Sequence, residues 1–173
     1  MGLDASFDAK YLSDKSLVAN CYEGSELRRN NQFLTRAQAT GKPGVTCHLT
    51  AGGLLISAED LASLYSVLLN DGQYNGKQYL SEQSLREMFT KQCETKKNFT
   101  QCLGIRRKDK LVGQRDMYYH NGEAYGIHSL MALDRDDRSG VIVITSGASA
   151  VRNDNTVFAV CDAVLNYCYE KIL

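Results

Sequence analysis

Apolar positions change their spacing along the chain, from irregular to helical and then to alternating. Residues 1–50 show no sustained apolar period and are rich in Ser, Asn, Gly and charged side chains, which predicts a loop-rich segment. After Ser57, leucines recur at helical spacing, and Ser57 with Asp60 three positions on is a typical helix start. A second capped stretch begins at Ser81. We therefore predict two helices between residues 57 and 90, separated by a tight turn at Asn75-Gly76.

From about residue 102 the apolar spacing changes to two, which predicts β-strands. The predicted strands lie within residues 103–108, 115–122, 126–134 and 140–147. A polar stretch, 134–140, predicts a hairpin connection between the last two. The continuous apolar run Val141–Thr145 favours a strand in the middle of a sheet that is covered on both faces.

A final helix is predicted after Asn153–Asn155, which would cap it. Its expected buried face consists of Val157, Cys161, Val164, Leu165, Cys168 and Ile172. Helices, then consecutive antiparallel strands, then one helix define an α+β fold. We divide it into a loop-rich and helical part, 1–101, and a part with the C-terminal strands and final helix, 102–173. With one helix to cover three or four strands, one face of the sheet is expected to stay bare.

Composition excludes several classes of function. Twenty basic side chains balance twenty acidic ones, so no net field favours nucleic acid as a partner. No apolar run is long enough for a transmembrane segment, and the first residues show no signal-peptide pattern. The six cysteines lack zinc-ligand spacing, so neither a metal nor a cofactor is predicted. Cys93 and Cys102 bracket a polar loop, which leaves both a disulfide and two free thiols open.

Two stretches carry a family resemblance. They are AGGLLISAEDLASLYSVLLNDG (51–72) and YYHNGEAYGIHSLMALDRDDRSGVIVITSG (118–147), with a weaker echo in GLDASFD near the start. Together they resemble the serine β-lactamase and penicillin-binding-protein superfamily, especially its class C and D-alanyl-D-alanine carboxypeptidase-like esterase branch. The resemblance implies the C-terminal portion of a β-lactamase-like fold. It also implies a bacterial protein of the cell envelope or a secreted one.

Within the second stretch, His120-Asn121-Gly122 occupies the place of the family's Lys-Thr-Gly, for which His-x-Gly is a variant. The resemblance implies that His120 and Asn121 contact substrate and that Gly122 leaves room for the substrate backbone along the strand edge. It implies that the backbone N–H of Glu123 forms half of an oxyanion hole. His128 carries no motif, and a lone strand histidine is usually structural.

The family nucleophile, the serine of Ser-x-x-Lys, is absent: no serine in this sequence has lysine three residues later. The resemblance implies a parent protein that hydrolyses a β-lactam, D-alanyl peptide or ester through a serine acyl-enzyme. This chain would supply the His-x-Gly strand and be inactive alone. The alternatives are a non-catalytic penicillin-binding-protein-like module that binds cell-wall peptide or a protein partner, and a fragment that forms a homodimer through its uncovered sheet.

Overall fold

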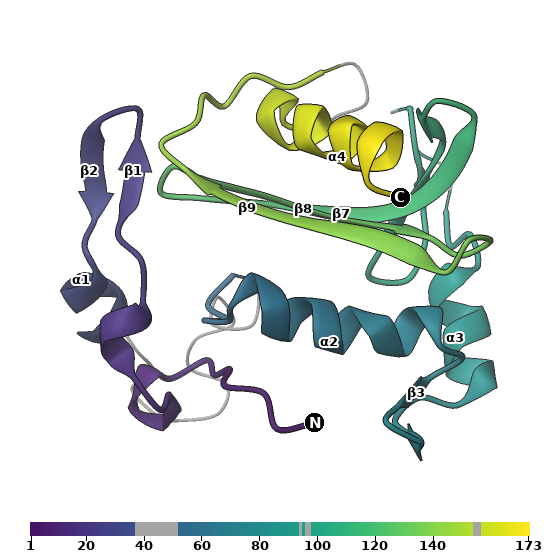
Figure 1. Cartoon of the computed structure of the whole chain (residues 1–173), viewed down its shortest axis with the longest axis horizontal. Helices are drawn as coiled ribbons and strands as arrows, with labels where there is room; N and C mark the ends of the chain where they lie inside the picture. Colours follow the sequence, from purple (N-terminus) through teal and green to yellow (C-terminus); the bar gives the residue numbers. More distant parts are fainter. Residues whose placement is uncertain (37–51, 94, 96–97, 154–156) are drawn as a thin grey trace.

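A five-stranded antiparallel sheet forms the centre of the molecule (Figure 1). The computed structural model describes residues 1–36, 52–93, 95, 98–153 and 157–173. The strands lie side by side in chain order as β5 (Thr100–Gln101), β6 (Arg106–Val112), β7 (Arg115–Ala124), β8 (Ile127–Asp134) and β9 (Ser139–Ser146). The four longer strands of this sheet, β6 to β9, come from the region where the apolar spacing is two, which confirms the predicted antiparallel sheet in a mixed helix and strand fold.

Two capped helices precede the sheet, as predicted. The first, α2 (Ala58–Leu69), begins after Ser57, whose hydroxyl accepts the Asp60 N–H at 3.0 Å. The second, α3 (Glu82–Phe89), begins after Ser81, whose hydroxyl accepts the Ser84 N–H at 3.1 Å. These bonds satisfy backbone donors that a helix start leaves free. No helix among the described residues is long and apolar enough to cross a membrane.

The connections around these helices are short. A small hairpin of β3 (Gln73–Tyr74) and β4 (Lys77–Gln78) joins α2 to α3, and it turns at Asn75 and Gly76, which both have positive φ. The tight turn predicted there is confirmed. Near the N-terminus lie η1 (Ala9–Tyr11), η2 (Lys15–Leu17), β1 (Cys21–Glu23), β2 (Glu26–Arg29) and α1 (Asn31–Arg36). Such short pieces fit the predicted loop-rich segment.

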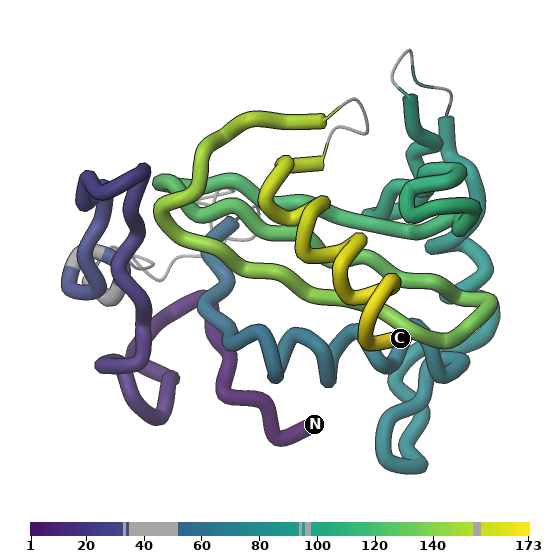
Figure 2. Tube along the Cα trace, turned by 45° about the horizontal axis from the view of Figure 1, so that its top comes forward, coloured from purple at the N-terminus to yellow at the C-terminus, as the bar shows by residue number. Residues whose placement is uncertain are grey.

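Helices cover both faces of the sheet, so the expectation of one bare face is wrong. Figures 1 and 2 show α2 on one face and α4 (Ala159–Lys171) on the other. The cluster on the α2 face consists of Leu68, Leu85, Phe89, Cys102, Ile105, Met131 and Leu133. The cluster on the α4 face consists of Leu111, Val112, Met117, Tyr119, Leu130, Ala132, Val143, Val157, Phe158, Cys161 and Leu165. The sequence count missed the coverage because α2 and α3 precede the strands and fold back against them.

The apolar run Val141–Thr145 lies in β9, which is the last strand of the sheet and not a middle one. The expected position is therefore wrong. Both α2 and α4 contact β9, so helices on both faces, not neighbouring strands on both sides, account for the continuous apolar pattern. Ile144, two residues beyond the clustered Ile142, keeps 41% of its surface exposed.

The final helix begins later in the chain than predicted, and part of its predicted buried face is exposed. Phe158 occupies the N-cap position of α4 and makes no side-chain capping bond, so Asn153 does not cap the helix; residues 154 and 155 lie outside the described part. Cys161 and Leu165 are buried as expected, but Val164 and Ile172 are 39% and 69% exposed. The buried stripe is narrower than predicted because one helix lying across the sheet presents only one side to it.

The cysteines that the structure describes are free thiols: Cys21, Cys93, Cys102, Cys161 and Cys168. Of the two arrangements left open for Cys93 and Cys102, the structure has the free one. Cys102 is buried and Cys93 is exposed, and the Cys102 thiol lies 3.5 Å from the Phe89 carbonyl oxygen. Cys102 acts as a small buried apolar residue. Cys47, like His48, lies outside the described residues.

Candidate functional site

The C-terminal half of β7 has an open edge. On one side β7 pairs with β8 from Tyr118, opposite Leu133, to Ala124, opposite Ile127. On the other side its pairing with β6 ends where Tyr119 faces Arg106. No strand among the described residues pairs with His120–Ala124 on that side. The predicted His-x-Gly residues therefore lie where the described part of the chain provides a pairing strand on one side of β7 alone.

Strand alternation divides these residues between the two faces of the sheet. Tyr119 belongs to the cluster on the α4 face and Tyr118 packs against the cluster on the α2 face. His120 and Gly122 therefore point to the α2 face, whereas Asn121 and Glu123 point to the α4 face. The four residues are consecutive, but their side chains do not form one group.

Gly122 lies close to Ser129 on the neighbouring strand. The two residues are cross-strand partners, and a Cβ atom at position 122 would come within 2.6 Å of Ser129 Oγ. Such a distance is a clash, so any larger residue at 122 forces the serine side chain to move. The glycine thus has a packing role within the chain in addition to the role that the resemblance implies.

His120 is exposed by surface area, but enough atoms surround its ring to affect its ionisation. The pKa of His120 is lowered from its ordinary value, first because burial disfavours the charged imidazole and second because the Arg106 cation repels it. At neutral pH the neutral form is thereby favoured. His120 offers one hydrogen-bond donor and one acceptor, where a lysine would offer a fixed positive charge.

Arg106 is a site residue that sequence reasoning did not single out. Its Nη1 donates to Asn121 Oδ1 at 2.8 Å, and its guanidinium lies 4.8 Å from the centre of the Phe99 ring. The residue stands at the first position of β6, next to the open edge. Only the register between β6 and β7 places it there, and no sequence motif reveals that register. This hydrogen bond from Arg106 holds the side-chain amide of Asn121 in one orientation.

The Glu123 side chain is held on the α4 face. Its Oε2 lies 2.8 Å from Arg152 Nη2, and its Oε1 lies 4.0 Å from His128 Nε2. His128 is Glu123's cross-strand partner on β8 and is only 2% exposed. Among the described residues the His128 Nδ1 atom has no hydrogen-bond partner. The side chain of Glu123, the predicted oxyanion-hole residue, thus has charged and polar neighbours on the α4 face of the sheet.

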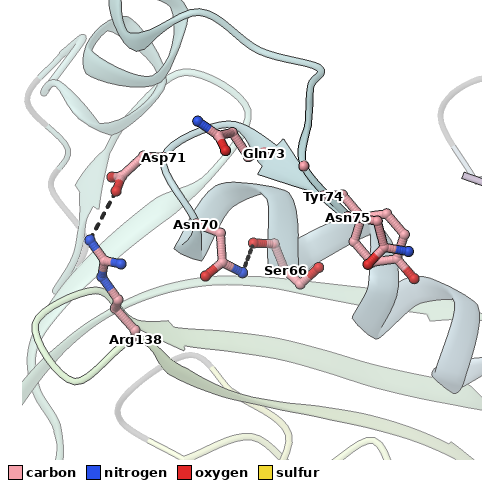
Figure 3. Close-up of a pocket in the computed structure, with 8 residues that line it drawn as sticks. Ser66, Asn70, Asp71, Gln73, Tyr74, Asn75 and Arg138 are labelled. Atoms are coloured by element: carbon pink, nitrogen blue, oxygen red, sulfur yellow. Dashed lines mark hydrogen bonds and ion pairs between the residues drawn. The ribbon is translucent and has the colours of Figure 1, made fainter.

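A polar cleft lies at the opposite end of the sheet (Figure 3). It has a volume of about 450 Å³ and is lined by Ser66, Asn70, Asp71, Gln73, Tyr74, Asn75, Gly76 and Arg138. Arg138 and Asp71 form an ion pair across its mouth, at 2.9 Å, with both side chains more than half exposed. The cleft shares no residue with the open edge of β7. It combines no nucleophile with a base, so β7 remains the candidate site.

The described residues form no complete catalytic or metal site. No serine in the chain has a lysine one helical turn later, and no group of three or more His, Cys, Asp or Glu side chains in the described part is placed to hold a metal ion. A serine ester also requires a nucleophile with a base beside it.

Comparisons with known proteins add no assignment: no protein-family model matches the chain, and no curated protein sequence does.

Proposed function

We propose that this chain is the C-terminal portion of a serine β-lactamase-like hydrolase and supplies its substrate strand. The open edge of β7 carries the proposal. Among the described residues, no strand pairs with His120–Ala124 on the side away from β8, so we place an extended acyl substrate along that side of the strand. The substrate is a β-lactam, a D-alanyl peptide or an ester, that is, a small molecule or peptide with a polarised carbonyl.

Each residue of the edge then has a chemical task. His120, favoured in its neutral form, gives the substrate a hydrogen-bonding partner on the α2 face. Gly122 keeps that face free of side-chain bulk beside the edge. The Glu123 backbone N–H supplies one of the two donors that stabilise the negative carbonyl oxygen of the tetrahedral intermediate, which forms when a serine hydroxyl attacks the carbonyl carbon.

The nucleophile must come from a polypeptide segment outside this sequence. Gly122, Ser129 and Ile144 form one cross-strand row on the α2 face. Ser129 is half-buried and Ile144 is 41% exposed, which leaves this part of the face available to a packed segment. A segment with Ser-x-x-Lys at this row would bring a serine next to His120 and Gly122. This chain by itself is then inactive.

Covalent labelling tests the proposal. Neither a fluorescent penicillin nor a fluorophosphonate probe should label this chain alone, because it lacks the activated serine. The polypeptide that joins upstream sequence to Met1 should contain Ser-x-x-Lys followed by Tyr-x-Asn, and it should be labelled on that serine. Upstream sequence without the motif, or a covalent adduct on this chain alone, would overturn the proposal.

Substitution then locates the site in the labelled polypeptide. His120→Ala should lower turnover by about 10²-fold, a typical effect of losing a positioned polar group. Arg138→Ala, in the polar cleft at the other end of the sheet, is the matched control and should leave turnover unchanged. The opposite ranking would assign the reaction to the cleft.

A second candidate function follows from the same edge without any nucleophile. Binding of an extended cell-wall peptide or a protein partner needs only a side of a strand that is not paired with another strand, and a glycine beside it. Titration of a D-alanyl-D-alanine peptide into the isolated chain distinguishes the two functions. Saturable shifts of the amide resonances of residues 120–124, with no labelled serine in the longer polypeptide, favour the binding module.

The resemblance also motivates a proposal about location: a bacterial protein of the cell envelope or one that is secreted. Fractionation of the source cells tests it. Recovery of the polypeptide in the envelope or medium is expected, and recovery in the cytoplasm alone would contradict it.

A further inference from the structure

The end of β7 extends beyond the start of β6, its neighbour on one side. Beyond Tyr119, β8 is the one strand of the described part of the chain that pairs with β7, and β7 leads into a turn at Tyr125 and Gly126, both with positive φ. Glu123 and Ala124 are exposed. A strand end with half of its ladder frays more readily than one inside a sheet. Something else must fix the direction of the Glu123 N–H if that group is to serve a bound oxygen.

The Glu123 carboxylate provides such a fixed point. Arg152, in the connection between β9 and α4, binds its Oε2 at 2.8 Å, and His128 on β8 places Nε2 at 4.0 Å from its Oε1. The two partners come from different parts of the chain. They approach the two oxygens of a single carboxylate, which restricts rotation of the side chain about its own axis.

Phe158 orders both partners. The Arg152 guanidinium lies 3.9 Å from the centre of the Phe158 ring, and the His128 ring centre lies 4.3 Å from it. Phe158 itself is completely buried. Arg152 is tied through its backbone as well, since it forms an isolated bridge with Phe158. An exposed arginine normally keeps much of its freedom in an ion pair, but stacking on an immobile ring removes part of it.

We propose that Arg152 and His128 are positioning residues: they hold the Glu123 side chain on the α4 face and thereby fix the Glu123 backbone N–H at the open edge. The role in catalysis rests on the proposed function, whereas the restraint on the strand does not. Arg152 and His128 touch no substrate. They act from beneath the strand, on the face opposite to His120.

Nuclear magnetic resonance relaxation on the isolated chain tests the restraint. In the wild type, the order parameters of the amides of residues 122–124 should lie near 0.85, typical of rigid backbone. Arg152→Ala should lower them toward about 0.6, the value of flexible backbone, and leave residues 117–119 unchanged. Arg152→Lys keeps the charge and should restore part of the order. Arg138→Ala breaks an exposed pair elsewhere and serves as the control.

The His128 ring provides a second measurement of the same restraint. Glu123→Gln removes the charge that faces Nε2, so the ring nitrogen shifts of His128 should change while the fold is kept. Unaltered order at 122–124 in Arg152→Ala, equal loosening along the whole strand, or unaltered His128 ring shifts in Glu123→Gln would each overturn the proposal. If the longer polypeptide resists acylation but these shifts and order parameters behave as expected, the proposed function fails and the restraint stands.

Discussion

Gly122 and Ser129 face each other across β7 and β8 so closely that a Cβ atom at position 122 would lie 2.6 Å from the serine oxygen. The glycine that the resemblance assigns to substrate is thus also required by a neighbour within the chain. The two roles make different predictions, because only the packing role depends on Ser129.

Gly122→Ala should destabilise the chain by about 1–3 kcal/mol, the usual cost of overpacking. In Ser129→Ala the oxygen is gone, so the same change at 122 should cost less, with a coupling energy of about 1 kcal/mol between the two sites. Urea unfolding of the two single variants and the double variant measures this. Strictly additive effects would mean that the pair does not clash.

His120 should titrate below the ordinary histidine pKa, mainly because its ring is desolvated and secondarily because Arg106 is near. The ring C–H resonance followed against pH measures the midpoint. Arg106→Gln should raise the midpoint without restoring the ordinary value, because desolvation is the larger cause. A midpoint in Arg106→Gln equal to that of the wild type would remove Arg106 as a cause.

The same shift makes stability depend on pH. A lowered pKa in the folded state means that the unfolded chain binds the proton more readily, so the contribution of His120 is present above the unfolded pKa and is lost as pH falls through the folded one. His120→Gln should therefore lose less stability than the wild type between pH 7 and pH 5. Thermal unfolding at several pH values gives the comparison.

The cysteines should differ sharply in reactivity. Burial, and secondarily Asp162, raises the pKa of the Cys161 thiol to about 11, so almost no thiolate exists at pH 8. Cys93 is exposed. Iodoacetamide followed by mass spectrometry should show modification of Cys93 first, and of Cys161 only after the chain unfolds. Early modification of Cys161 would show that α4 detaches from the sheet.

Truncation to alanine should cost much stability at one position of α4 and little at the position next to it. Leu165 is completely buried, whereas Val164 is 39% exposed. Leu165→Ala should cost about 2–5 kcal/mol of unfolding free energy, and Val164→Ala should change it by less than about 0.5 kcal/mol. Similar losses at the two positions would restore the wider buried face that the sequence pattern predicted.

What could be predicted from the sequence is what short-range chemistry determines. Ser57 and Ser81 cap helices through bonds to residues three positions away, and Asn75 and Gly76 both have the positive φ of a tight turn. The place of β9 at the sheet edge depends on which strands are neighbours, and its apolar pattern reflects two covering helices instead. No periodicity contains that information.

The candidate site was predictable in part for the same reason. His120, Asn121, Gly122 and Glu123 form a motif, but the open edge depends on where β6 begins. The predicted strand starts at residue 103, whereas Gly104 has positive φ and β6 begins at Arg106. Arg106, Arg152 and His128 meet the motif only through register and loop folding. Arg106 and Arg152 are far from the motif in sequence, whereas His128 is close to Glu123 in sequence and meets it through the register of β7 and β8.

No strand in the described part of the chain pairs with β9 on the side away from β8, which keeps the predicted homodimer open to test, now through an edge and not a bare face. Its eight residues, Ser139–Ser146, include no charged residue and no proline, the devices that usually block edge pairing. Size-exclusion chromatography over a range of concentrations should show a dimer. A monomer at every concentration, with no binding of an apolar dye, would contradict it.

Six of the eight residues of β8 are buried, and they alternate between the two clusters: Leu130 and Ala132 belong to one, Met131 and Leu133 to the other. Neither cluster can unfold while the other stays intact, because β8 contributes residues to both and each cluster loses those contacts when the strand detaches. Heating should therefore produce one cooperative transition with the calorimetric and van't Hoff enthalpies equal, and the amides of β8 should be the last to exchange with solvent.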